Sequence, residues 1–172
     1  EGEVTFEGKD VRALAASGQK HFWGVEMTMV FQDPMTSLNP VKKCGEQIAE
    51  TLRYHMGRSR RDALAEAEDL LGQVGLPDPA KRVDQYPHEL SGGLRQRVVI
   101  AMALACEPSL LIADEPTTAV DVTVQRHLLN LLDKLREERG MSMILITHDL
   151  GVARGRCDDV AVMYAGRIVE RS

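Results

Sequence analysis

The stretch Leu90-Ser91-Gly92-Gly93-Leu94-Arg95-Gln96-Arg97 organises this chain. Its two adjacent glycines form a turn that leads into a helix-forming run, Val98 to Ala105. Backbone N–H groups at the start of a helix have no partner inside the helix, and the helix dipole turns its positive end toward them. The stretch therefore predicts a site for an anion, phosphate above all.

A strand that ends in two carboxylates follows the glycine turn. Leu110 to Ala113 is apolar, and Asp114 and Glu115 come directly after it. Asp114 suits a Mg²⁺ ion, and Glu115 suits the water that attacks a γ-phosphate. Taken alone, the pair is explained equally well as a solvated strand end. The glycine turn upstream favours the chemical interpretation.

Two more polar side chains follow predicted strands. Gln32 comes after Val25–Phe31, and His148 comes after Met143–Ile146, which we expect to be a buried strand. Neighbouring parallel strands end at the same edge of a sheet, so His148 can reach phosphates held near Glu115. The amide oxygen of Gln32 could ligate Mg²⁺, and its NH₂ group could contact water.

Asp121 has two interpretations. It could reach across a subunit interface, or it could be the N-cap of a helix that we predict over Thr123–Arg139. The sequence alone leaves both open.

Composition limits the class of protein. The chain has 172 residues, a net charge of −5 and only 4% aromatic residues, which argues against a nucleic-acid partner. The three cysteines are far apart and form no C-x-x-C pair, so a reducing cytosol fits best. The longest apolar run, Val98–Cys106, is far shorter than the ~20 residues of a membrane helix. Any membrane role therefore goes through a partner.

The order of the elements predicts the fold class. Strands alternate with helices, which is typical of an α/β fold with a mostly parallel sheet. A helical insert is expected between about Val41 and Glu89.

Five segments, in this order, resemble the motifs of the ABC-transporter ATPase. They correspond to its Q-loop, signature motif, Walker B strand, D-loop and H-loop: Gln32-Asp33-Pro34, Leu90-Ser91-Gly92-Gly93, Leu111-Ile112-Ala113-Asp114-Glu115-Pro116, Ala119-Val120-Asp121 and Thr147-His148-Asp149. Any one of them alone would be a weak signal, whereas five in order cover nearly the whole chain.

A narrower resemblance is also present. Phe31–Pro40 and Ala113–Thr123 are similar to the ATPase subunits of dipeptide, oligopeptide and nickel importers. Leu94–Val98 resembles the D-type subunit of these systems more than its F-type partner. Leu94 stands where that branch often has Met, and Val120 where Leu is usual. Both substitutes are hydrophobic.

The resemblance implies an architecture and a set of partners. It implies a P-loop NTPase-like ABC ATPase core, with a helical subdomain at about 41–105 and the α/β core in 1–40 and 106–172. ATP and Mg²⁺ are the implied cofactors. The implied partners are a second ABC ATPase subunit, identical or different, and transmembrane permeases, with an extracytoplasmic solute-binding protein acting indirectly. The implied location is the cytoplasmic face of the cell membrane.

The resemblance also assigns roles to residues. Gln32, Asp114, Glu115 and His148 would act on ATP bound in their own subunit, with Asp114 and Gln32 near Mg²⁺. Ser91, Gly92 and Gly93 would bind the γ-phosphate held by the partner subunit, and Asp121 would lie at the interface.

One departure from the family pattern is large. No G-x-x-x-x-G-K-[ST] motif occurs in the sequence, so the P-loop is missing. We expect it upstream of Glu1, which makes the chain a fragment with an incomplete core that is inactive alone. Two alternatives stay open: a regulatory or binding module without a P-loop, and a fragment of a DNA-maintenance ATPase. The second alternative expects long coiled coils, and the interval before the signature motif has no sustained heptads.

Overall fold

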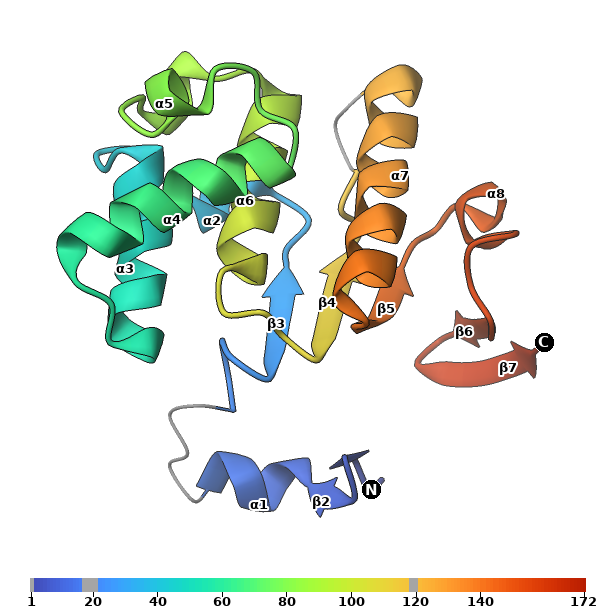
Figure 1. Ribbon diagram of the computed structural model, residues 1–172. Helices are drawn as coiled ribbons and strands as arrows, with labels where there is room; N and C mark the ends of the chain where they lie inside the picture. The colour runs from blue at the N-terminus through green and yellow to red at the C-terminus, as the bar shows by residue number, and fades with distance from the viewer. Residues whose placement is uncertain (1, 17–21, 118–120) are drawn as a thin grey trace.

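The computed structural model describes residues 2–16, 22–117 and 121–172 (Figure 1). The strands are β1 (Thr5–Phe6), β2 (Lys9–Asp10), β3 (Met27–Val30), β4 (Leu110–Asp114), β5 (Ser142–Ile146), β6 (Ala161–Tyr164) and β7 (Arg167–Arg171). The helices are α1 (Val11–Ala16), α2 (Pro34–Ser37), α3 (Cys44–Met56), α4 (Arg60–Gln73), α5 (Pro79–Arg82), α6 (Gly92–Leu104), α7 (Val122–Arg139) and α8 (Leu150–Ala153), with a 3₁₀ turn at Pro87–Glu89.

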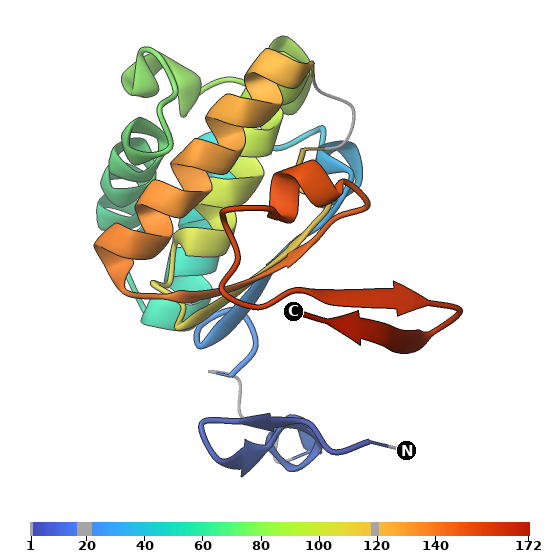
Figure 2. The same cartoon turned by 90° about the vertical axis from the view of Figure 1, so that its right-hand side faces the viewer.

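A parallel sheet in the order β3-β4-β5 forms the centre of the molecule. Its register aligns Met29 with Ile112 and Ile112 with Ile144. Helices α6 and α7 cover one face, as the nearly edge-on view in Figure 2 shows. The predicted α/β fold with a mostly parallel sheet is confirmed. The pairs β1–β2 and β6–β7 are separate antiparallel hairpins.

The expectation that Met143–Ile146 is a buried strand is wrong. Its side chains alternate between half-buried and exposed, and Ile144 and Ile146 are 50% and 45% exposed. In the described sheet, β5 pairs only with β4, so it is an edge strand. Every second side chain of β5 points to the face that α6 and α7 leave uncovered.

Helix α6 begins earlier than the sequence predicts. The predicted helix started at Val98, but the structure has Ser91 as the N-cap and both glycines in the first turn. A Cβ on Gly93 would lie 2.8 Å from Cγ1 of Val124 in α7. Close packing between the two helices therefore requires a glycine here, and it overrides the low helix propensity of glycine.

The predicted helical insert contains α3, α4 and α5. Helices α3 and α4 form one core with α6. Ser59 caps α4 by accepting a hydrogen bond from the backbone N–H of Asp62. Leu52, Leu71 and Ile100 are fully buried in this core. The division of the chain at about residues 41 and 105 stays a prediction.

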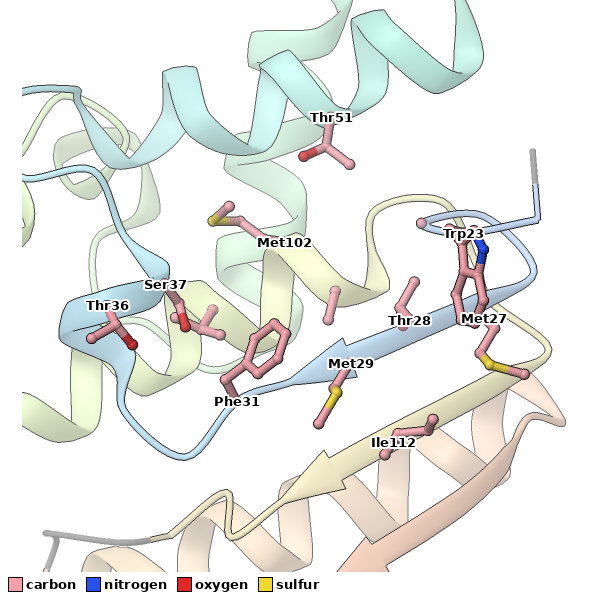
Figure 3. A pocket seen from close by; sticks show the side chains of 13 residues that line it. Trp23, Met27, Thr28, Met29, Phe31, Thr36, Ser37, Thr51, Met102 and Ile112 are labelled. Carbon is pink, nitrogen blue, oxygen red and sulfur yellow. The ribbon is translucent and has the colours of Figure 1, made fainter. Parts of the chain in front are cut away.

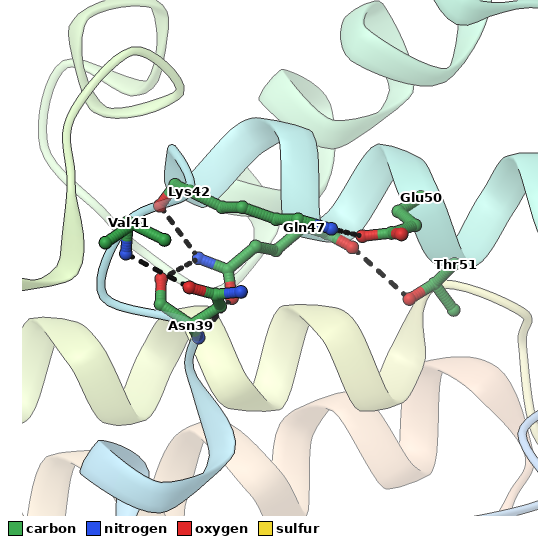
Figure 4. A network of polar contacts seen from close by, with 6 residues as sticks. All are labelled: Asn39, Val41, Lys42, Gln47, Glu50 and Thr51. Carbon is green, nitrogen blue, oxygen red and sulfur yellow. Dashed lines mark hydrogen bonds and ion pairs between the residues drawn. The ribbon is translucent and has the colours of Figure 1, made fainter.

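A buried amide fastens the loop that leads into α3. Gln47 is 5% exposed, and its Oε1 accepts a hydrogen bond from the N–H of Asn39 at 2.8 Å. Its Nε2 donates to the carbonyl oxygens of Asn39 and Lys42, at 3.1 and 3.0 Å. Figure 4 shows this side chain inside the loop, with the Lys42–Glu50 ion pair on the surface above it. One side chain thus pairs three backbone groups.

None of the helices in the described ranges is both long enough and apolar enough to span a membrane.

Candidate functional site

Three predicted site residues meet at the carboxyl edge of the parallel sheet. Gln32 follows β3, Glu115 follows β4 and His148 follows β5. Gln32 Nε2 donates to Glu115 Oε2 at 2.8 Å, and His148 Nδ1 lies 2.9 Å from Glu115 Oε1. Both oxygens of one carboxylate are therefore held, by residues 83 and 33 positions away in the sequence. We call Gln32, Glu115 and His148 the carboxylate trio.

The backbone at Glu115 is held in an uncommon conformation. Its φ is +43°, in the left-handed region that side chains other than glycine rarely adopt. Its N–H donates to the carbonyl of Ile146 at 3.0 Å, which continues the pairing of β4 with β5 by one residue. Such strain persists where surrounding contacts over-determine it, and it is concentrated at functional sites.

The trio is polar and open to solvent on the His148 side. The side chain of His148 is 79% exposed, whereas that of Glu115 is 23% exposed. The hydrogen bond to Glu115 and then the charge of Glu115 raise the pKa of His148 above its usual value, while burial acts in the opposite direction. The negative carboxylate thus favours the imidazolium form.

Asp114 ends β4 immediately before Glu115 and is half-buried. Within the described ranges, no cluster of three or more His, Cys, Asp or Glu residues could hold a metal ion by itself. Mg²⁺ bound together with a nucleotide takes one or two protein ligands and completes its shell with phosphates and water, so Asp114 and one further oxygen would suffice to hold it. The Nε2 of Gln32 is used by Glu115, which leaves its Oε1 as an oxygen ligand.

The glycine turn forms a separate recess of about 390 Å³ between the starts of α6 and α7. Its lining consists of Ser91, Gly92, Gly93, Leu94, Arg97, Asp121, Val124 and His127. Ser91 makes no side-chain capping bond to the helix. None of the trio lines this recess, as far as the described ranges show. The structure therefore does not bring the two predicted sites together within one chain.

Asp121 is the N-cap of α7. Its Oδ1 accepts hydrogen bonds from the N–H groups of Thr123 and Val124, each at 3.0 Å. It also lines the recess, so the capping role does not exclude a role at an interface. Ala119 and Val120 of the predicted D-loop lie outside the described residues.

Two residues of the recess were missed by the sequence reasoning. The sequence assigns no role to Arg97, and it favours a surface or packing role for His127. Residues three apart share a face of a helix, so His127 lies on the same side of α7 as Val124, but the sequence does not show that this side faces the glycine turn. No sequence pattern indicates that the side chain of Arg97 points toward this recess.

A second hollow, of about 830 Å³, lies beside β3. Figure 3 shows side chains from β3, β4, α3 and α6 around it. Its lining is Trp23, Gly24, Met27, Thr28, Met29, Phe31, Thr36, Ser37, Thr51, Val99, Met102, Ala103 and Ile112. Among the described residues, the lining carries no charged side chain, and the hydroxyl of Thr28 is buried without a hydrogen-bond partner. We call it the β3 groove.

Residues 1–118 match the family described as ABC transporter. The chain belongs to the ABC transporter family. This ABC chain is 57% identical over 169 residues to the oligopeptide transport ATP-binding protein OppD of Bacillus subtilis, covering 98% of this chain and 47% of that protein. It is 49% identical over 168 residues to the dipeptide transport ATP-binding protein DppD of Escherichia coli K12, covering 98% and 51%.

These relatives confirm the predicted resemblance to the D-type ATP-binding subunits of peptide importers. The ABC chain spans about half the length of the curated relatives that it matches. It also resembles a solved ATP-binding cassette, a dimer in a post-hydrolysis state with ADP and Pi. That likeness has a TM-score of 0.86 at 29% identity and covers 100% of this chain and 73% of the other. The predicted ABC ATPase fold is confirmed.

Proposed function

We propose that this chain is part of the ATP-binding and hydrolysing subunit of an importer for peptides or a related small solute. The carboxylate trio is the observation that carries the proposal. A glutamate held by an amide on one oxygen and an imidazole on the other, at the carboxyl edge of a parallel sheet, can orient and deprotonate a water molecule. The names of the relatives support peptides as the solute class.

Each member of the trio then has a part in the reaction. Glu115 accepts the proton of the attacking water. Gln32 holds Oε2 of that carboxylate at 2.8 Å and so fixes its direction. His148 Nδ1 faces Glu115, which leaves Nε2 to donate a hydrogen bond to an oxygen of the γ-phosphate. Asp114 and the Oε1 of Gln32 would hold Mg²⁺, which neutralises charge on the phosphates when it is bound.

The glycine turn serves a partner subunit. Ser91, Gly92 and Gly93 would contact the γ-phosphate of ATP bound to the P-loop of a second ABC ATPase, identical or different, with Asp121 at the same interface. The separation of the recess from the trio supports this arrangement, and the dimer of the solved relative agrees with it.

The chain alone should not turn over ATP. Its 172 residues contain no G-x-x-x-x-G-K-[ST] motif, and that loop holds most of a bound triphosphate. We propose that residues outside these 172 supply the P-loop.

The remaining partners are the permeases. The β3 groove combines residues that adjoin the Q-loop, such as Phe31 and Thr36, with Thr51 of α3 and Met102 of α6. An apolar segment of a permease would bury this surface. Gln32 directly follows Phe31, so a movement of Gln32 would displace a residue that contacts the permease. The subunit would then lie on the cytoplasmic face of the membrane, and a solute-binding protein outside would act through the permease.

A chimera tests the proposal. The residues of Bacillus subtilis OppD outside the matched region are joined to this chain in the places that they occupy in OppD, and ATP turnover is compared with that of the 172-residue chain. We expect turnover by the chimera only, and a loss of about 10²–10⁴-fold in Glu115→Gln. A chimera whose turnover survives Glu115→Gln would overturn the assigned chemistry. Turnover by the 172-residue chain that Glu115→Gln abolishes would overturn the need for an added P-loop.

A further inference from the structure

Arg97 joins the start of α6 to the end of α4. Its Nη1 donates to the carbonyl oxygen of Val74 at 2.5 Å, across 23 positions of sequence. Val74 is the C-cap of α4 and is 1% exposed. A cation at this end of a helix satisfies a carbonyl that has no partner inside the helix, and it is attracted by the helix dipole.

The contact leaves no room beside Gly75. This glycine has φ +73°, and a Cβ built on it would lie 2.8 Å from Nη1 of Arg97. Burial lowers the pKa of Arg97, so the guanidinium has lost part of its hydration and depends on the carbonyl that it contacts.

The other side of Arg97 faces the glycine turn. Arg97 lines the 390 Å³ recess together with Ser91, Gly92 and Gly93. The turn is thus fixed from two directions. Gly93 packs against Val124 of α7, and Arg97 ties the first turns of α6 to α4.

We propose that Arg97 is a positioning residue for the glycine turn. Its bond to Val74 sets the orientation of the start of α6 relative to α4, and it need not touch nucleotide. The importance of the turn rests on the proposed function, because the turn would meet the γ-phosphate in a partner's site. The bond itself joins two segments of this chain.

Arg139 provides a matched control. Its Nη1 donates to the carbonyl oxygen of Leu104 at 2.9 Å, at the opposite end of α6. Its Nη2 donates to Oε1 of Gln73 at 2.6 Å, so Arg139 also contacts the end of α4 but does not reach the start of α6. We compare Arg97→Met, Arg97→Lys and Arg139→Met in the 172-residue chain. The readouts are the amide NMR signals of Gly92 and Gly93, the hydrogen-exchange rates of the Gly75 and Leu76 amides, and the unfolding temperature.

The expected result separates position from stability. Arg97→Met should shift the amide signals of Gly92 and Gly93 and speed hydrogen exchange at Gly75 and Leu76 by about tenfold or more. The reason is that the bond from Arg97 to Val74, which holds the start of α6 against the end of α4, is lost. Arg97→Lys, which keeps a donor, should stay closer to the wild type. Arg139→Met should lower the unfolding temperature and leave the glycine signals in place. Glycine signals that stay in place in Arg97→Met, or move equally in Arg139→Met, overturn the proposal.

A second pair of variants tests the contact from the α4 side if Arg97→Met does not fold. Gly75→Ala forces a Cβ toward the guanidinium, whereas Gly140 has a similar φ of +62° with nothing within 4 Å of its Cβ position. Gly75→Ala should move the Gly92 and Gly93 signals, and Gly140→Ala should not. Equal behaviour of the two variants overturns the proposal. None of these readouts needs ATP, so they fail or succeed independently of the Glu115→Gln turnover test.

Discussion

Replacing Gln47 by Met should lower the free energy of unfolding by more than the replacement of one polar side chain usually does. Methionine fills a similar volume but makes none of the three backbone hydrogen bonds of Gln47. A buried group left unpaired costs about 1–3 kcal/mol. Asn39 and Lys42 lie in an exposed loop, so water can reach part of the vacated positions. We therefore expect a loss of about 2–4 kcal/mol in the free energy of unfolding.

Urea unfolding followed by circular dichroism measures this loss. A thermal scan should show a fall of about 4–16 °C in the unfolding temperature, since 1 kcal/mol shifts it by about 2–4 °C in a chain of this size. Lys42→Met is the control, because it removes the exposed Lys42–Glu50 ion pair of the same loop and should cost less than about 1 kcal/mol. Gln47→Met within about 0.5 kcal/mol of the wild type would refute the reasoning.

Three further predictions follow from single contacts. Glu115 raises the pKa of His148, so Glu115→Gln should lower that pKa in an NMR titration, and an unchanged titration would contradict the contact. The stability that the pair adds is present below pH 6.5, the unfolded pKa of histidine, and is lost as the pH rises through the folded pKa. Gly93→Ala should cost about 1–3 kcal/mol despite the better helix propensity of alanine, and Val124→Ala should recover part of that loss in a double-mutant cycle; simple additivity of the two would argue against the clash. Burial raises the pKa of Cys44 to about 11, so iodoacetamide at neutral pH should modify this thiol only after unfolding, and rapid labelling of the folded chain would disagree with the structure.

The parts of the fold that local chemistry controls could be predicted from the sequence. Helix α7 was expected over Thr123–Arg139 and spans Val122–Arg139, because an N-cap aspartate and a C-terminal glycine mark its two ends. The meeting of Gln32, Glu115 and His148 was also predictable, although they are far apart in sequence. Parallel strands end at one edge of their sheet, and each of these residues follows a strand.

The missed features depend on contacts between distant elements. The early start of α6 at Gly92 reflects packing of Gly93 on α7, which no local propensity encodes. The exposure of β5 follows from its place at the sheet edge, whereas its apolar composition predicted burial. The direction of Arg97 depends on where α4 ends relative to α6. Sequence periodicity describes one element at a time, so it cannot reveal these pairs.

The central claim is that the trio and the glycine turn of one chain serve two different ATP molecules. Mixing two inactive forms of the chimera tests it directly. One form carries Ser91→Arg in the turn, and the other carries Glu115→Gln in the trio. In a mixed dimer, the intact turn of the second form completes the site that contains the intact Glu115 of the first.

ATP turnover of the mixture is the decisive measurement. Half of the dimers in an equal mixture are mixed and each has one complete site of two, so turnover should return to about a quarter of the unmutated chimera if the sites act independently. A mixture as inactive as its two components, in dimers shown to exchange subunits, would mean that the turn and Glu115 must belong to the same chain and would contradict the account.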